Sequence, residues 1–139
     1  MEVRSARTGE DISKCWHVMY ALRPHLVEET FVSTVQEMLT EGYQLAFIEE
    51  NTKAVAAIGF RYLQYVFNGK HFYIDDLSTL PESRGKGYAG MLLEYVIELA
   101  RQKGYTSVTL DSGYARNDAH RFYLNKGFVL ASHHFLKKL

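Results

Sequence analysis

The chain has 139 residues, 47% of them hydrophobic and 23% charged, which suits one domain with a sizeable core and excludes two ordinary domains. Sixteen Lys and Arg balance sixteen Asp and Glu, so the net charge is zero. No global field then draws the protein to nucleic acid or to a membrane surface, and any anion must be bound by a local group of residues. Because there is one cysteine, no signal-peptide-like start and no long apolar run, we expect a single domain over residues 1–139 in the cytoplasm.

The first third of the chain predicts a short strand and two helices. Residues 3–7 suit a short strand, and apolar residues recur every three or four positions from residue 10 to residue 22, as on one face of a helix. Pro24 interrupts that helix, and a second helix is expected over residues 32–39, with Gly42 after its end.

Three strands follow these helices. Residues 43–49 and 53–67 are rich in β-branched and aromatic residues, and residues 71–80 continue that composition. Asn68-Gly69, between the last two segments, is the strongest short hairpin signal in a sequence. Residues 53–67 and 71–80 are therefore predicted to pair antiparallel.

The last third of the chain alternates helices and strands. A helix with a clear apolar stripe is expected up to Gly104, then a strand over residues 106–111 and a helix over residues 115–126. Residues 128–136 suit a final strand or hairpin. The order β-αα-βββ-α-β-α-β predicts an α/β (α+β) fold, with a mixed, mostly antiparallel sheet flanked by helices.

One loop is rich in glycine, because residues 85–90 read G-K-G-Y-A-G. That string matches the G-x-G-x-x-G turn of dinucleotide-binding folds, and Asp111 ends the next strand, where a ribose-binding acid would lie. Against this, residues 81–84 separate the loop from its strand, that strand is a hairpin arm, and the chain is too short for such a fold. A Walker A loop is excluded, because no Ser or Thr follows Lys86. A turn built only for packing is left open.

Read in another frame, the same loop fits a different motif. Residues 84–89, R-G-K-G-Y-A, fit [R/Q]-x-x-G-x-[G/A], and residues 122–128 read F-Y-L-N-K-G-F. With these two motifs on this element order, nearly the whole chain resembles the GNAT superfamily of acetyl-CoA-dependent N-acetyltransferases. The resemblance implies direct transfer of an acetyl group from acetyl-CoA to an amine, without an acyl-enzyme.

The resemblance also implies that the glycine loop binds the pyrophosphate of CoA. The start of a helix offers unpaired N–H groups and a positive dipole end, and glycine lets the backbone approach an anion closely. Arg84 and Lys86 add two positive charges, and the end of the preceding strand is expected to pair with the pantetheine amides. The CoA-binding residues implied here are Leu77, Ser78, Thr79, Arg84, Gly85, Lys86, Gly87, Tyr88 and Ala89.

The departing thiolate needs a proton donor, for which Tyr123 is the candidate. In the family the tyrosine of F-Y-x-x-x-G-F lies near the CoA sulfur as general acid, and Tyr123 matches that position, which makes it a CoA contact as well. A phenol, with a pKa near 10, suits an acid. The other interpretation is a core aromatic on an amphipathic helix.

The amine needs a proton acceptor, because a lysine-like amine is almost wholly charged at pH 7. Asp75 and Asp76 are the candidates, since two carboxylates in an apolar strand are costly to bury without a purpose or a partner. Adjacent strand residues point to opposite faces, so only one is expected to reach the substrate. A salt bridge or a solvated edge is the alternative, and many relatives carry Glu where this chain has Tyr73.

One residue departs from the family pattern, and the residue after it is a further candidate contact. Arg116 stands where the family often has Asn, and Asn117 follows it. We expect Arg116 to touch CoA or an acidic substrate, and Asn117 either to contact CoA or to cap its helix. The pair His133-His134 lacks a partner at metal-ligand spacing, so no metal site is expected.

The acceptor is the least defined part of the prediction. Residues 118–123, D-A-H-R-F-Y, look like the corresponding string of aminoalkylphosphonate N-acetyltransferases and related small-amine enzymes. The family's acceptor site lies largely on the first two helices, here around residues 16–31, whose mixed side chains select no amine class. We expect a primary amine of a small molecule, or a peptide amine. A non-catalytic acyl-CoA sensor, a small dinucleotide-binding module and pairing into a homodimer are left open.

Overall fold

A computed structural model describes all residues from Met1 to Leu139. Internal contacts divide the chain into two compact units, residues 1–109 and 110–139. The elements in chain order are β1 (Arg4–Ser5), α1 (Gly9–Lys14), α2 (Trp16–Leu22), α3 (Glu28–Leu39), β2 (Tyr43–Glu50), β3 (Lys53–Tyr65), β4 (Gly69–Thr79), the 3₁₀ turn η1 (Pro81–Ser83), α4 (Tyr88–Gln102), β5 (Ser107–Leu110) and α5 (Asn117–Asn125).

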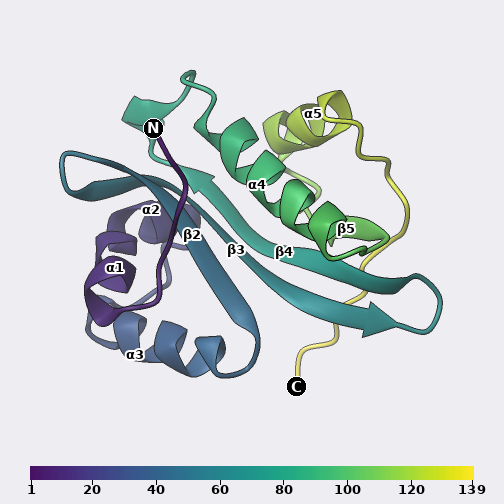
Figure 1. Cartoon of the computed structure of the whole chain (residues 1–139), viewed down its shortest axis with the longest axis horizontal. Helices are drawn as coiled ribbons and strands as arrows, with labels where there is room; N and C mark the ends of the chain where they lie inside the picture. The colour runs from purple at the N-terminus through teal and green to yellow at the C-terminus, as the bar shows by residue number, and fades with distance from the viewer. The chain divides into compact units, whose positions relative to one another are not determined.

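The five strands form one sheet in the order β1-β2-β3-β4-β5. The first three neighbouring pairs are antiparallel, and α4 connects β4 to β5 (Figure 1). The predicted hairpin is confirmed, because β3 and β4 pair from Tyr65 opposite Gly69 to Ala56 opposite Thr79. Gly69 has a φ of +74°, a conformation that glycine adopts without strain. The predicted α/β fold with a mostly antiparallel, helix-flanked sheet is thus confirmed.

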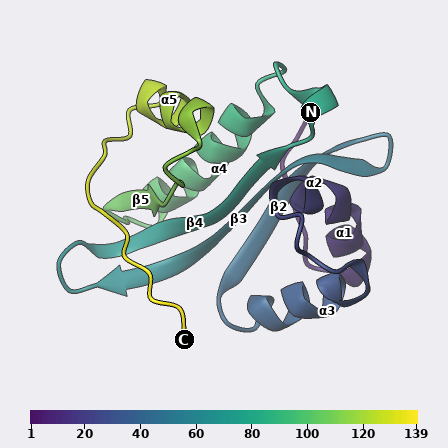
Figure 2. The same ribbon diagram turned by 180° about the vertical axis from the view of Figure 1, so that it is seen from behind.

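Helices cover both faces of this sheet. On one face, Phe60 of β3 packs edge to face against Phe72 and against Tyr95 of α4, with ring centroids 5.1 and 6.5 Å apart. On the other face, the Ser78 hydroxyl of β4 donates to the Val18 carbonyl of α2 at 2.8 Å. Figure 2 shows α4 and the group α1–α3 on either side of the β3–β4 hairpin. None of the helices reaches the length and apolarity that crossing a bilayer requires.

Two sequence predictions need correction. The helix expected over residues 10–22 is broken at Cys15, because the Cys15 amide bonds the Ile12 carbonyl three residues back, which tightens the turn in the manner of a 3₁₀ helix. The final strand or hairpin expected over residues 128–136 is absent, and this segment is largely exposed. Apolar composition alone does not make a strand, since a strand also needs a hydrogen-bonding neighbour.

Candidate active site

The glycine loop joins η1 to α4 in an open conformation. Gly85 and Gly87 have φ values of +81° and +82°, which strongly favour glycine, and nothing lies within 4 Å of a Cβ placed on either. The amides of residues 85–87 make no backbone hydrogen bond, and the first amides of α4 have no partner within a helix. The loop thus presents a row of donors at a positive helix end, which is an arrangement that binds anions.

One of the two cations expected at this loop is already paired. Arg84 is exposed, whereas Lys86 Nζ lies 3.2 Å from Glu50 Oε2 at the end of β2. The Tyr88 hydroxyl donates to the same oxygen. The hydrogen bonds from Tyr88 and then from Lys86 hold the pKa of the Glu50 carboxyl below its usual value, and the Glu50 bond raises the pKa of Tyr88. No local signal in the sequence marks Glu50 as a neighbour of this loop.

A β-bulge in β4 lies before the loop. Asp76 pairs with Gly59, but Ile74 pairs with Phe60, so Asp75 has no residue opposite it. An extra residue of this kind bends the strand and redirects its side chains. The bulge brings both carboxylates into one cluster with side chains from β2, β3 and the end of α2. The assumption that the two side chains point to opposite faces therefore fails, because regular alternation stops at the bulge; which of them reaches the substrate stays a prediction.

Each of these carboxylates is held by an arginine. Arg61 of β3 grips Asp75 with two nitrogens, and its closest contact is 2.7 Å. Arg23, directly after α2, donates to Asp76 Oδ1 at 2.9 and 3.1 Å and to the Asp75 carbonyl at 2.9 Å. Both carboxylates thus form salt bridges. Of the two side chains, Asp75 is the more exposed to solvent, at 21% against 10% for Asp76.

Tyr43 of β2 is the remaining member of this cluster. Its hydroxyl donates to Asp76 Oδ2 at 2.9 Å, and Arg61 lies over its ring, 5.4 Å from the centroid. Burial, followed by the Asp76 charge, raises the pKa of Tyr43 well above its usual value, so the phenol stays a donor. The space for it exists because residue 59 is glycine: a Cβ there would overlap the Tyr43 hydroxyl. Sequence reasoning missed Tyr43, Gly59 and Arg61, which only the strand register identifies.

The end of β4 is tied to α2 through Ser78. This residue is buried, and its hydroxyl is engaged by the Val18 carbonyl. The Ser78 side chain is therefore a structural link between sheet and helix.

The predicted residues of the second unit lie on or beside α5. Tyr123 is half-buried, with its ring 5.4 and 5.7 Å from those of Phe122 and Phe128. Burial raises the pKa of Tyr123, and the Arg116 charge partly opposes that rise, so the phenol carries its proton at neutral pH. Arg116 occupies the N-cap position and Asn117 the first helical position, and no side chain caps the helix. The suggestion that Asn117 caps α5 is therefore wrong.

The other potentially reactive side chains form no metal site and no second catalytic site. His134 lies 3.6 Å from Asp111, and no group of three or more His, Cys, Asp or Glu side chains is placed to hold a metal ion. Burial raises the pKa of the Cys15 thiol to about 12, which suits a core residue rather than a nucleophile.

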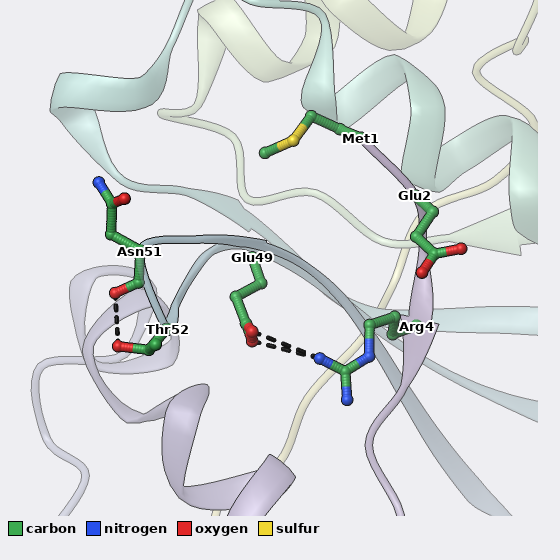
Figure 3. A pocket seen from close by; sticks show the side chains of 6 residues that line it. All are labelled: Met1, Glu2, Arg4, Glu49, Asn51 and Thr52. Carbon is green, nitrogen blue, oxygen red and sulfur yellow. Dashed lines mark hydrogen bonds and ion pairs between the residues drawn. The ribbon is translucent and has the colours of Figure 1, made fainter.

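A shallow pocket beside the N-terminus is lined by Met1, Glu2, Arg4, Glu49, Asn51 and Thr52 (Figure 3). Arg4 and Glu49 point toward one another across it, 3.2 Å apart. Lys14 also pairs with Glu49 at 3.0 Å, and Arg4 with Asp11 at 3.4 Å. These ion pairs tie α1 and β1 to β2.

The sheet bears on the two interpretations of the glycine loop. The strand before it, β4, is antiparallel to its neighbour β3, as are the other two pairs among the first four strands, whereas dinucleotide-binding folds have a mostly parallel sheet. The sheet therefore does not support the dinucleotide-binding interpretation.

Comparison with known proteins agrees with this fold and loop. Residues 10–128 match the acetyltransferase (GNAT) family. An uncharacterized N-acetyltransferase of Bacillus subtilis (strain 168), YhdJ, is 35% identical over 139 residues, which are 99% of this chain and 98% of that relative. The aminoalkylphosphonate N-acetyltransferase of Salmonella typhimurium is 39% identical over 66 residues, 48% of this chain and 43% of the relative.

Among solved structures, AAC(6')-Iy in complex with the bisubstrate analog CoA-S-monomethyl-acetylneamine has the same fold. The TM-score is 0.84 at 14% identity, over 99% of this chain and 97% of the other. The sequence matches and the fold together show that the chain belongs to the GNAT family and is an N-acetyltransferase.

Proposed function

We propose that this enzyme transfers the acetyl group of acetyl-CoA directly to the primary amine of a small molecule. The observation that carries the proposal is the open glycine loop at the start of α4, whose amides have no backbone partner. A diphosphate is an anion that fits a row of free amides at a helix start. The bisubstrate analog named for AAC(6')-Iy contains CoA, which supports the same choice of co-substrate.

The chain offers three groups that would hold CoA. The amides of residues 85–89 would bind the diphosphate, and the exposed Arg84 would add charge to them. The backbone of Leu77 and Thr79 would pair with the pantetheine arm. Arg116 and Asn117, at the start of α5, are proposed as further contacts.

Acetyl-CoA supplies an activated thioester: an N–C bond forms, the C–S bond breaks, the amine loses one proton and the departing sulfur gains one. Tyr123 is proposed as the donor of the second proton, because it matches the tyrosine of the F-Y-x-x-x-G-F motif and a phenol carries its proton at neutral pH. A positioned donor of this kind typically contributes about 10²–10⁴-fold to the rate.

Asp75 and Asp76 are proposed to handle the proton of the amine. Their oxygens already accept hydrogen bonds from Arg61, Arg23 and Tyr43, so neither carboxylate is free of partners. This pairing favours a role in which Asp75, the more open of the two, orients a water molecule that takes the proton. Asp76 then fixes the bulge through Tyr43 and Arg23.

The proposed acceptor class is a small primary amine. The 66 residues shared with the aminoalkylphosphonate N-acetyltransferase support it. The region around residues 16–31 adds Trp16 and Tyr20, whose rings lie 5.0 Å apart. An aromatic surface suits the ammonium form of an amine.

The test is a titration followed by a turnover assay. Isothermal titration with acetyl-CoA, CoA and NADH should show binding of both CoA species and none of NADH. Thiol release is then measured with aminoalkylphosphonates first and other small amines next. Absence of CoA binding would refute the proposal, whereas CoA binding without turnover on any amine would favour a non-catalytic acyl-CoA sensor.

A further inference from the structure

We propose that Glu50 acts as a built-in competitor of phosphate: it holds Lys86 of the glycine loop until the CoA diphosphate displaces it. This inference rests on the proposed binding of CoA at the loop. It concerns a residue outside the loop motif, 36 positions away from Lys86 in the sequence.

In the contact between Glu50 and Lys86, the Glu50 carboxylate is held in place, whereas the Lys86 side chain is exposed and flexible. Glu50 Oε2 accepts hydrogen bonds from both Lys86 and Tyr88. Tyr88 is buried, with 7% of its surface exposed, so its hydroxyl anchors the carboxylate at one place. The Lys86 side chain is 49% exposed and has a flexible four-carbon stem, so it can leave Glu50 without disturbing the fold.

The backbone of Glu50 is also held in place. Glu50 pairs with Lys53 across the tight turn of the β2–β3 hairpin, in which Asn51 and Thr52 have φ values of +51° and +65°. A two-residue turn with both central residues in the left-handed region is the type that closes hairpins rigidly. The carboxylate is therefore presented to the loop by a strand end rather than by a flexible segment.

Two consequences follow for an anion that arrives at the loop. Glu50 neutralises Lys86, so the anion is attracted mainly by Arg84 and by the free amides of the loop. The Glu50 carboxylate also repels a diphosphate bound nearby. Removing the Glu50 charge should therefore tighten CoA binding.

The experiment compares Glu50→Gln with a matched control, Glu82→Gln. Glu82 lies on η1 beside the same loop and is exposed, so its substitution removes the same charge without breaking the pair. Titration with CoA should give a dissociation constant about two- to five-fold lower for Glu50→Gln than for Glu82→Gln, the range expected for an exposed ion pair. Lys86→Met should weaken CoA binding more in the Glu50→Gln background than in the wild type.

The outcomes separate this inference from the function on which it rests. If the wild type binds CoA and the two Gln variants have equal dissociation constants, Glu50 does not compete and the inference is overturned. Weaker binding by Glu50→Gln would also overturn it, because Glu50 would then support the loop. If the wild type does not bind CoA at all, the proposed function fails and the inference fails with it. Circular dichroism melting of each variant checks that the fold is kept.

Discussion

Replacing Gly59 by alanine tests the cluster at the β4 bulge. In most strands this change would stabilise the protein, because glycine in a strand interior costs about 0.5–1 kcal/mol relative to alanine. Here the new Cβ would overlap the Tyr43 hydroxyl, so the buried phenol must move and its bond to Asp76 is lost.

The expected loss can be worked out from two contributions. A hydrogen bond to a charged group contributes about 1.5–3 kcal/mol, and overpacking a filled site costs about 1–3 kcal/mol. After subtraction of the backbone gain, Gly59→Ala should lower the free energy of unfolding by about 1.5–5.5 kcal/mol. The measurement is urea denaturation followed by circular dichroism.

Two further variants isolate the cause. Gly9→Ala is the matched control, because a Cβ at Gly9 would meet its nearest atom at 3.5 Å, an ordinary contact, and stability should change little. Gly59→Ala should cost less in a Tyr43→Leu background, where the hydroxyl is gone. If Gly59→Ala were as stable as the wild type, the packing of Tyr43 under Asp76 would be refuted.

Three other outcomes are expected. Thr52→Gly should raise the free energy of unfolding by about 1 kcal/mol in urea titrations, because Thr52 has a φ of +65°, a strained conformation for a β-branched residue. Tyr123→Phe should lower kcat by about 10²–10⁴-fold and change the dissociation constant of CoA, measured by calorimetry, far less; an unaltered kcat would exclude Tyr123 as the proton donor. The folded-state pKa of Tyr43 is raised, so its contribution to stability is complete below the unfolded-state pKa of about 10 and is lost as pH rises through the folded value. Chemical denaturation from pH 8 upward should show this decline, and Tyr43→Phe should flatten it.

The parts of the fold that the sequence predicted are those governed by local chemistry. Asn68-Gly69 indicates a hairpin whichever strands flank it, and β3 and β4 pair around it. A helix likewise starts directly after the glycines, at Tyr88, as the motif predicted, and Gly85 and Gly87 have positive φ values.

The parts that could not be predicted depend on register and on distant residues. Nothing near Asp75 indicates that it lacks an opposite residue, since the bulge follows from how β3 and β4 align over their whole length. The partners of the two aspartates lie 14 to 53 positions away in the sequence. The expected strand over residues 128–136 failed for a related reason, because composition does not supply a neighbouring strand.

The burial of Cys15 makes the catalytic assay simple to read. The protein's single thiol is buried, with no exposed surface, and its pKa is raised to about 12, so disulfide reagents in solution reach it only when the protein unfolds. A colorimetric signal from such a reagent therefore reports released CoA alone, without a background from the enzyme. Used without acetyl-CoA, the same reagent reacts with Cys15 only in molecules whose core has opened. The rate of that reaction therefore measures how often the core opens.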